Sequence, residues 1–313
     1  DPSTGLWNET FVDLAVADVT PLSVVRTWRQ NDPNRRSFGI GMTLSYDMYL
    51  YSPSGYMSAD LITPAGGRIH FVRTSTGTGW TDAALTSTSN PGPFYNATLV
   101  WNGAGWNLTT QDGMLYVFAD NAPLQYFQDR FGNRVTLTRA TPTGPITTVS
   151  SSNGRWIKFT YGTNNVITSA TDNTGRTVNY GYDAGFNYLQ TVTDPNGGIT
   201  TFNWDTANNR ITSIQYPRQN PAAPVAMTTA FDANGRVQSQ TLLGNVAYTY
   251  AYTLDGSGNV TATDITMTDS NYTPTPRTTV CKFTFNAAGY WTSNKQAFGQ
   301  TIEQDYTAVR GGD

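Results

Sequence analysis

The chain has 313 residues, a formal net charge of −3 and a single cysteine, and 13% of its residues are charged. This slight negative charge gives no electrostatic reason to expect nucleic acid or an anionic membrane as a partner. One cysteine excludes an intrachain disulfide and a cysteine-rich zinc site, and no run approaches the roughly 20 apolar residues that a membrane-spanning helix needs.

Residues 1–125 predict a β-rich N-terminal domain. Alternating apolar positions predict strands at 6–15, 21–29 and 38–50, a hairpin at 61–73 and short strands at 97–101, 106–110 and 114–118. The last three strands are joined by glycine-containing segments at 102–105 and 111–113, which predict hairpin turns. The Gly, Ser, Thr and Pro content of residues 77–93 predicts a long surface loop.

From residue 126 the sequence repeats. Gly132, Gly154, Gly175 and Gly197 are spaced 22, 21 and 22 residues apart, and a fixed period of this size indicates a stacked repeat architecture. Each unit carries an aromatic-x-aromatic pair, which places both rings on one face of a strand. A second short strand and a turn such as Asp194-Pro195-Asn196-Gly197 follow, so that one unit is a β-hairpin. The residues that define the repeat are Gly154, Phe159, Tyr161, Gly175, Arg176, Tyr180, Tyr182, Asp183, Asp194, Pro195, Gly197, Phe202, Trp204 and Asp205.

The repeat region extends over residues 126–313 and becomes irregular after residue 217. Three prolines between 217 and 224 predict an inserted loop, and later fragments of the unit recur at 231–237, 250–252 and 283–285. No segment of ten or more residues shows the 3.6-residue apolar period of an amphipathic helix. The sequence therefore predicts an all-β fold of antiparallel hairpins stacked into a curved, spiralling sheet, preceded by the N-terminal β domain.

Four aspartates of the repeats, Asp172, Asp183, Asp194 and Asp205, lie at intervals of 11 residues. A row of carboxylates could bind calcium or act on a sugar. Each one, however, lies at a strand end, where aspartate hydrogen-bonds the local backbone in Asx turns, and the interval is half of the repeat. We interpret these aspartates as structural residues.

Neither His70 nor Cys281 indicates catalysis. His70 is the one histidine, so that a Ser/His/Asp triad or a histidine metal site would have to use it, and a strand histidine that faces solvent or a pocket wall is the simpler interpretation. Cys281 alternates with Phe283 and Phe285, which predicts a small buried hydrophobe rather than a nucleophile. We expect no catalytic residue, cofactor or metal, and hence no enzyme.

The paired rings of the repeats allow two interpretations. They could form a platform for carbohydrate or stack on bases, or they could build cross-strand ladders that hold the sheet together. The ladder is the interpretation that the repeat favours.

The N-terminal sequence resembles the domain that precedes the repeats in Rhs and YD-repeat proteins. The resemblance lies in Thr4-Gly5, Asp13-Leu14, Pro21-Leu22, Arg26-Thr27-Trp28, Phe38-Gly39-Ile40-Gly41-Met42 and Gly66-Gly67-Arg68. Trp28 and Met42 replace the tyrosine and the tryptophan of the family pattern, while order and spacing hold over roughly 75 residues. The chain is thus similar to a DUF6531-type domain followed by YD repeats, within the β-shell family that includes teneurins and Tc toxins.

This resemblance implies a structural role in a secreted or cell-surface protein. Family members wind a long sheet into a hollow shell, which in bacteria often holds a C-terminal toxin, whereas teneurins are adhesion proteins. The Asp-Pro-x-Gly-Leu-like self-cleavage element has no counterpart in residues 305–313, so that no autoproteolytic residue carries over. We expect the N-terminal part of a shell that scaffolds or encloses cargo and whose partners are the rest of a longer chain. The alternatives are a self-assembling fibre or adhesin joined through β-edges and, third, a protein that binds or degrades surface polysaccharide.

Overall fold

The computed structural model describes residues 1–313 except 53–54, 89–91, 122, 218–224, 243, 273, 297–300 and 304–313. The described part consists of β-strands with one 3₁₀ turn, Thr163–Asn165, and contains no α-helix. The all-β antiparallel class is therefore confirmed. The loop predicted at 217–224 and the C-terminal segment 305–313 lie almost wholly outside the described residues.

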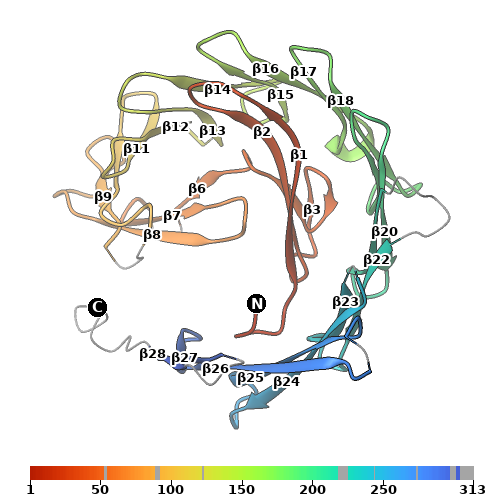
Figure 1. The fold of residues 1–313 in the computed structure, drawn as a ribbon. Helices are drawn as coiled ribbons and strands as arrows, with labels where there is room; N and C mark the ends of the chain where they lie inside the picture. Colours follow the sequence, from red (N-terminus) through yellow and green to blue (C-terminus); the bar gives the residue numbers. More distant parts are fainter. Residues whose placement is uncertain are drawn as a thin grey trace. The chain divides into compact units, whose positions relative to one another are not determined.

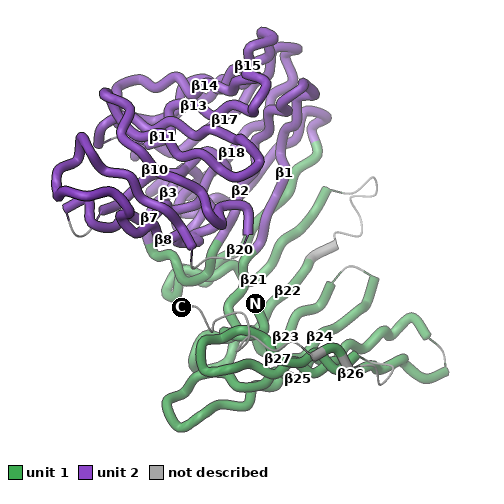
Figure 2. The backbone as a smooth tube through the Cα atoms, turned by 90° about the vertical axis from the view of Figure 1, so that its left-hand side faces the viewer, with its two compact units in different colours: residues 1–8, 29–33, 198–313 green, residues 9–28, 34–197 purple. Residues whose placement is uncertain are grey.

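The chain forms two compact units, which we describe separately (Figure 2). Unit 1 comprises residues 1–8, 29–33 and 198–313, and unit 2 comprises residues 9–28 and 34–197. Each unit thus combines N-terminal residues with strands of the repeat region. The predicted boundary between residues 125 and 126 stays a prediction.

Unit 2 contains a small sheet and a long one. The small sheet has the order β1-β2-β5, from strands β1 (Asn8–Val16), β2 (Leu22–Arg29) and β5 (Met42–Leu44), and β3 (Arg35–Arg36) pairs with β4 (Gly39–Ile40). In the long sheet of this unit each strand from β6 to β18 pairs antiparallel with the next along the chain, ending at β19. Within this unit the long sheet curves around β1 and β2 (Figure 1). Its strands are β6 (Tyr49–Tyr51), β7 (Ser58–Ile62), β8 (Arg68–Arg73), β9 (Ala84–Thr86), β10 (Thr98–Trp101), β11 (Gly105–Thr109), β12 (Leu115–Ala119), β13 (Leu124–Gln128), β14 (Arg134–Arg139), β15 (Ile146–Ser151), β16 (Trp156–Tyr161), β17 (Ile167–Asp172), β18 (Thr177–Tyr182) and β19 (Leu189–Thr193).

Unit 1 continues the same hairpin pattern, with each strand from β20 to β28 paired antiparallel to the next. Residues 1–8 contact this sheet, since the Val237 amide donates to the Gly5 carbonyl at 2.8 Å and the Thr263 hydroxyl donates to the Pro2 carbonyl at 2.6 Å. The strands are β20 (Ile199–Asp205), β21 (Arg210–Tyr216), β22 (Val225–Phe231), β23 (Val237–Leu242), β24 (Val246–Leu254), β25 (Val260–Asp269), β26 (Arg277–Phe285), β27 (Trp291–Lys295) and β28 (Thr301–Glu303).

The core of unit 2 follows from period-two alternation. In β2 every second residue is buried, including Leu22, Val24 and Trp28, which have no exposed surface. In β16 the buried positions are Ile157 and Phe159, and the residues between them face solvent. Burying one such side chain contributes about 1.5–3 kcal/mol, so that the small sheet and the repeats each present an apolar face.

Two strand predictions were wrong in detail. The strand predicted at 38–50 is broken into β4, β5 and β6 because residues 45–48 form a turn, in which the half-buried Asp47 accepts hydrogen bonds from the Leu44 amide at 2.8 Å and the Ser37 hydroxyl at 2.7 Å. The loop predicted at 77–93 contains strand β9, because Leu85 is buried and pairs opposite Leu99 on one side and Arg73 on the other. A single apolar residue suffices there, since the strand is hydrogen-bonded along both edges.

The buried position predicted for Cys281 was also wrong. Its side chain is half-buried, like Phe283 and Phe285 on the same face of β26. The alternation was read correctly, but no residue of β26 is fully buried, so that neither face of this strand is fully covered.

Candidate functional site

In the described part of the repeat region, seven hairpin turns share one hydrogen-bond pattern. In each, a glycine amide donates to the carbonyl three residues earlier, and the glycine has a φ between 80° and 88°, a conformation that costs other residues energy. Where the first residue is aspartate or asparagine, its side chain accepts the amide two residues later. The first residues and glycines are Asp129 and Gly132, Ser151 and Gly154, Asp172 and Gly175, Asp194 and Gly197, Asp232 and Gly235, Asp255 and Gly258, and Asn286 and Gly289.

Asp172 illustrates how the repeat aspartates are used. The side chain is fully buried and accepts the amides of Thr174 and Arg176 at 2.9 and 3.0 Å, and the Arg176 guanidinium lies 2.6 Å from its other oxygen. Burial alone would raise the pKa of Asp172, but the hydrogen bonds from Thr174 and Arg176 outweigh it and hold the pKa below its usual range. A carboxylate held in this way has no lone pair directed at a substrate.

The other three aspartates of the row also accept local donors. Asp183 accepts the amides of Asn187 and Tyr188, each at 2.7 Å, and Asp205 accepts the Ala207 amide at 3.2 Å. Asp194 accepts the Asn196 amide at 2.7 Å. This geometry fits the structural interpretation, although the roles of the repeat residues stay a proposal.

The second ring of the aromatic pair forms a repeated hydrogen bond. The hydroxyls of Tyr161, Tyr182 and Tyr252 each donate to a backbone carbonyl at 2.6 Å, and in every case the acceptor lies 15 residues earlier, at Ile146, Ile167 and Val237. Burial raises the pKa of all three tyrosines. We call this contact the tyrosine lock. It joins β16, β18 and β24 to the start of the strand before each of them.

The predicted ring-on-ring ladder between the repeats was wrong. Phe159 faces Ala170, Tyr180 faces Val192 and Phe202 faces Ile214 on the neighbouring strands. The reason lies in the period, because one repeat spans two strands. Successive aromatic pairs, such as those of β16 and β18, therefore lie about 9–10 Å apart. The strand between them places an aliphatic residue opposite the ring.

A buried ion pair connects the N-terminal strands of unit 2 with its repeat strands. Arg26 of β2 is 1% exposed and holds Asp13 of β1 with two hydrogen bonds, of 2.5 and 3.0 Å. Tyr180 of β18 donates its hydroxyl to the same Asp13 carboxylate at 2.9 Å. Burial, followed by the nearby Asp13 charge, raises the pKa of Tyr180 well above its usual value.

The ion pair is enclosed by rings and by further polar contacts. The Arg26 guanidinium lies 4.6 Å from the Phe11 ring centre and 5.8 Å from those of Phe38 and Tyr180. Beside it, the Arg176 guanidinium donates to the Ala15 carbonyl at 2.8 Å. Asp13, Arg26 and Tyr180 thus form a clasp between the small sheet and β18, and we use this name for the three residues.

Outside the repeats, His70 is the residue that the sequence analysis considered for a catalytic triad or a metal site. The histidine faces solvent, as predicted, with a side chain that is 46% exposed and with Nδ1 2.7 Å from an Asp60 oxygen. Among the described residues no group of three or more His, Cys, Asp and Glu side chains could hold a metal ion.

Sequence reasoning missed the clasp and an aromatic cluster around Trp106. The clasp partners lie 13 and 167 residues apart, so that no spacing indicates them. The cluster could have been noticed from Trp101 and Trp106, which flank a predicted hairpin turn and therefore pair across it.

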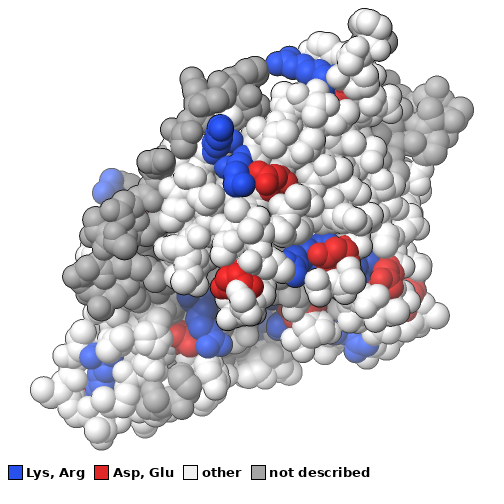
Figure 3. All heavy atoms as spheres, turned by 90° about the horizontal axis from the view of Figure 1, so that it is seen from below, with Lys and Arg blue, Asp and Glu red and all other residues white. Residues whose placement is uncertain are grey.

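Charge gives no sign of a polyanion site. On the face shown in Figure 3, acidic and basic side chains lie scattered among uncharged residues, several of them beside a group of opposite sign. None of the helices in the described ranges is long and apolar enough to cross a membrane.

Comparisons with known proteins give a family match at the N-terminus. Residues 1–71 match the family described as "Domain of unknown function (DUF6531)". No curated protein matches the sequence.

Three solved structures resemble the chain weakly. The Photorhabdus luminescens Tc holotoxin pore is 13% identical with a TM-score of 0.42, covering 94% of this chain and 15% of its own. A TcdB2-TccC3-Cdc42 structure is 11% identical with a TM-score of 0.42, and the match covers 93% of this chain and 18% of the other. A TcdB2-TccC3 structure without the hypervariable C-terminal region is 13% identical with a TM-score of 0.40, and the match covers 94% of this chain and 15% of the other. The chain spans less than a fifth of these chains, and the fold described above rests on its own strand pairings. The match over residues 1–71 confirms, for these residues, the resemblance to a DUF6531-type domain that the N-terminal motifs predicted.

Proposed function

We propose that the chain is a non-catalytic structural protein, the N-terminal part of an Rhs/YD-type shell that scaffolds or encloses cargo such as a toxin domain. The observation that carries this proposal is the clasp, which ties the DUF6531 domain to repeat strand β18 inside unit 2. A buried ion pair with a third hydrogen-bonded partner fixes one arrangement of two sheets, which is what a wall element needs.

The hairpin unit supports the same role. Its aspartates accept hydrogen bonds from turn amides and its tyrosine hydroxyls donate to backbone carbonyls. The side chains of the repeat that could act in catalysis therefore stabilise the sheet. Each hairpin contacts mainly its neighbours, and stability in such arrays is a sum of local terms and neighbour contacts. A sheet built in this way can be lengthened by adding units.

The test uses the native protein from its source. We expect the intact chain to be longer than the 34.2 kDa of this sequence and to protect a further segment from protease until the protein is denatured. Native mass spectrometry and limited proteolysis measure both. An intact chain of about this mass that protects nothing would contradict the shell.

A fibre or adhesin subunit is the second candidate, and one observation favours it. Val280 of β26 and Ile302 of β28 are 48% and 49% exposed in unit 1, and exposed apolar residues on strands promote contacts between copies. Filaments with one repeated subunit contact, seen by electron microscopy of the native protein, would establish this function instead of the shell. In both cases we place the protein outside the cell or on its surface.

Polysaccharide degradation is the third candidate. It requires that one of the repeat aspartates act on a sugar. Turnover of a glycan that is lost in Asp194→Asn would establish an enzyme and overturn the structural proposal.

A further inference from the structure

Four aromatic side chains form a continuous cluster in unit 2, outside the repeats. Tyr56 stacks on Trp106 with ring centres 5.9 Å apart, Trp106 meets Trp101 edge-on at 5.4 Å, and Trp101 meets Trp80 edge-on at 4.5 Å. Trp80 is 45% exposed. The cluster extends from the half-buried Trp101 and Trp106 of the β10–β11 hairpin to the exposed Trp80.

A pocket lies beside the cluster. Its inner part, a cavity of about 100 Å³, has an apolar floor and is walled by Tyr56 and Trp106. An open groove of about 600 Å³ adjoins it and shares Tyr51, Tyr56 and Asn121 with it, which is within the usual size of ligand sites, about 300–1,000 Å³. The floor consists of Leu50, Ala59, Leu85 and Leu99.

The backbone that carries Tyr56 is held in an unfavourable conformation. Tyr56 has a φ of 68°, which is a genuine outlier for a bulky side chain and costs of order 1–3 kcal/mol. Its amide donates to the Ser52 hydroxyl at 3.1 Å, and its carbonyl accepts the Arg73 guanidinium at 3.3 Å. The surrounding structure therefore fixes the direction of this ring.

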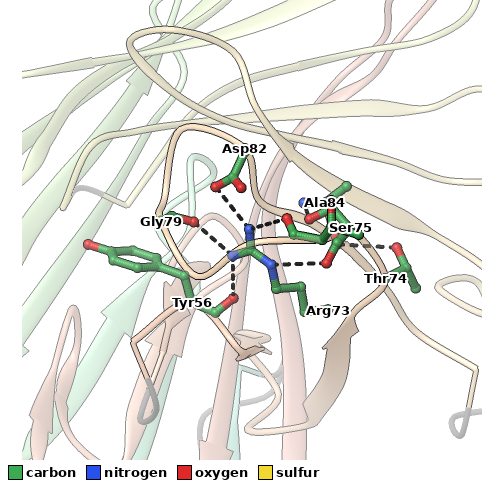
Figure 4. A network of polar contacts seen from close by, with 8 residues as sticks. Tyr56, Arg73, Thr74, Ser75, Gly79, Asp82 and Ala84 are labelled. Atoms are coloured by element: carbon green, nitrogen blue, oxygen red, sulfur yellow. Dashed lines mark hydrogen bonds and ion pairs between the residues drawn. The ribbon is translucent and has the colours of Figure 1, made fainter.

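Arg73 binds backbone carbonyls of two turns, at Tyr56 and at Gly79 (Figure 4). The guanidinium is 1% exposed and donates to the carbonyls of Tyr56 at 3.3 Å and Gly79 at 2.7 Å, next to Trp80. It also forms an ion pair of 2.9 Å with Asp82 and donates to the carbonyls of Ser75 and Thr76, each at 3.3 Å. A buried cation that binds backbone of two separate turns makes the rings a preorganised surface, which lowers the cost of binding.

The lining determines the ligand class. The described residues around the cavity and groove include the Asp120 carboxylate and the Asn121 amide but no lysine or arginine, so that this lining does not favour an anion. Flat ring faces accept the C–H face of a sugar. The apolar floor accepts a methyl group rather than a hydroxyl, while a carboxylate and an amide can pair with an amide N–H and C=O.

We propose that this pocket binds a neutral pyranose that carries an N-acetyl group. The sugar ring lies against Tyr56 and Trp106, and the acetyl methyl enters the inner cavity. Asp120 accepts the acetamido N–H and Asn121 donates to its carbonyl. Such a site goes beyond the structural role, because it gives the protein a glycan ligand of its own.

The test is isothermal titration calorimetry with tri-N-acetylchitotriose and with cellotriose, which lacks the acetyl groups. We expect the acetylated trisaccharide to bind and to change tryptophan fluorescence, and cellotriose to bind at least about tenfold more weakly, the discrimination that one apolar group of this size provides. Equal affinities, or no heat with either sugar at millimolar concentration, would overturn the proposal.

Variants separate the site from the fold. Trp106→Ala and Asn121→Gly should each raise the Kd about tenfold or more, and glycine keeps the φ of 51° that Asn121 adopts. Trp156→Ala and Asn209→Gly are the matched controls, since Trp156 lies on β16 and Asn209 has a φ of 55° in another turn. Circular dichroism confirms folding, and if Trp106→Ala fails to fold, Asn121→Gly decides. An unchanged Kd in Asn121→Gly would contradict the proposed contact.

Discussion

The hydroxyl of Tyr182 donates a 2.6 Å hydrogen bond to the carbonyl of Ile167, 15 residues earlier in the chain. Tyr161 and Tyr252 make the same contact at the same separation in units 2 and 1. One side chain per hairpin thus connects the end of a strand to the beginning of the one before it. The lock is therefore a property of the hairpin itself and does not depend on which unit contains it.

Removing one lock should lower stability by a modest, measurable amount. We expect Tyr182→Phe to reduce the free energy of unfolding by about 1 kcal/mol, the net value of a typical hydrogen bond. Urea denaturation followed by circular dichroism measures the change. Tyr95→Phe, on a ring that is 44% exposed, is the control and should have no effect. A Tyr182→Phe variant as stable as the wild type would contradict the lock.

The locks should make the protein sensitive to alkali. Burial raises the pKa of Tyr161, Tyr182 and Tyr252 in the folded state, while an unfolded tyrosine titrates near about 10. Below that pH both states are protonated and the stabilisation is complete. Above it the unfolded state loses its protons first, so that the free energy of unfolding falls by up to about 1.4 kcal/mol per pH unit for each tyrosine.

Urea midpoints between about pH 8 and pH 11 test this dependence. The wild type should lose stability above about pH 10, and Tyr182→Phe should lose less per pH unit because one titrating group is missing. A midpoint that stays constant to pH 11 would show that the tyrosines titrate normally.

The clasp should respond differently to single and double substitutions. Arg26→Met leaves the buried Asp13 carboxylate without its cation, and removal of one partner of a buried pair costs about 3–5 kcal/mol. The double variant Asp13→Leu/Arg26→Met removes both charges and should recover most of this loss. A double-mutant cycle, with free energies of unfolding measured by urea denaturation, gives the coupling free energy between Asp13 and Arg26. Additive losses would mean that the two side chains do not stabilise each other.

The glycine of the hairpin turn should resist substitution for conformational reasons alone. Gly175 has a φ of +88° with open space around a built Cβ, so that Gly175→Ala meets no clash and should cost about 1–2 kcal/mol from the backbone. Gly256 also lies in open space but does not have a positive φ, and Gly256→Ala should be neutral or slightly stabilising. Thermal unfolding of the two variants compares them. If the two substitutions lowered stability equally, the positive φ of Gly175 would not be the cause of the loss.

Strands and turns could be predicted from the sequence because their causes are local. Alternation in residues 22–29 and the glycine period from Gly132 to Gly197 report side-chain direction and φ, and both depend on near neighbours. The break at residues 45–48 was missed because the hydrogen bonds that Asp47 accepts from Leu44 and Ser37 have no sequence signature.

The contacts of the candidate site could be predicted only in part. The tyrosine of the lock is visible in the repeat, but its acceptor is a backbone carbonyl, which every residue possesses. The pairing of Arg26 with Asp13 depends on the order of β1 and β2 in the sheet, and that of Tyr180 with Asp13 depends on how the long sheet curves within unit 2. Neither property can be read from residue types.

The clasp has a consequence during synthesis of the chain. Asp13 and Arg26 leave the ribosome before Tyr180, which follows Asp13 by 167 residues, an interval of about 8–33 s at synthesis rates of about 5–20 residues per second. The hairpins between them close from contacts about 15 residues apart and can form as they emerge. The N-terminal strands therefore remain without their cover until β18 is complete, and during this interval they are the part of the nascent chain that a chaperone would have to shield.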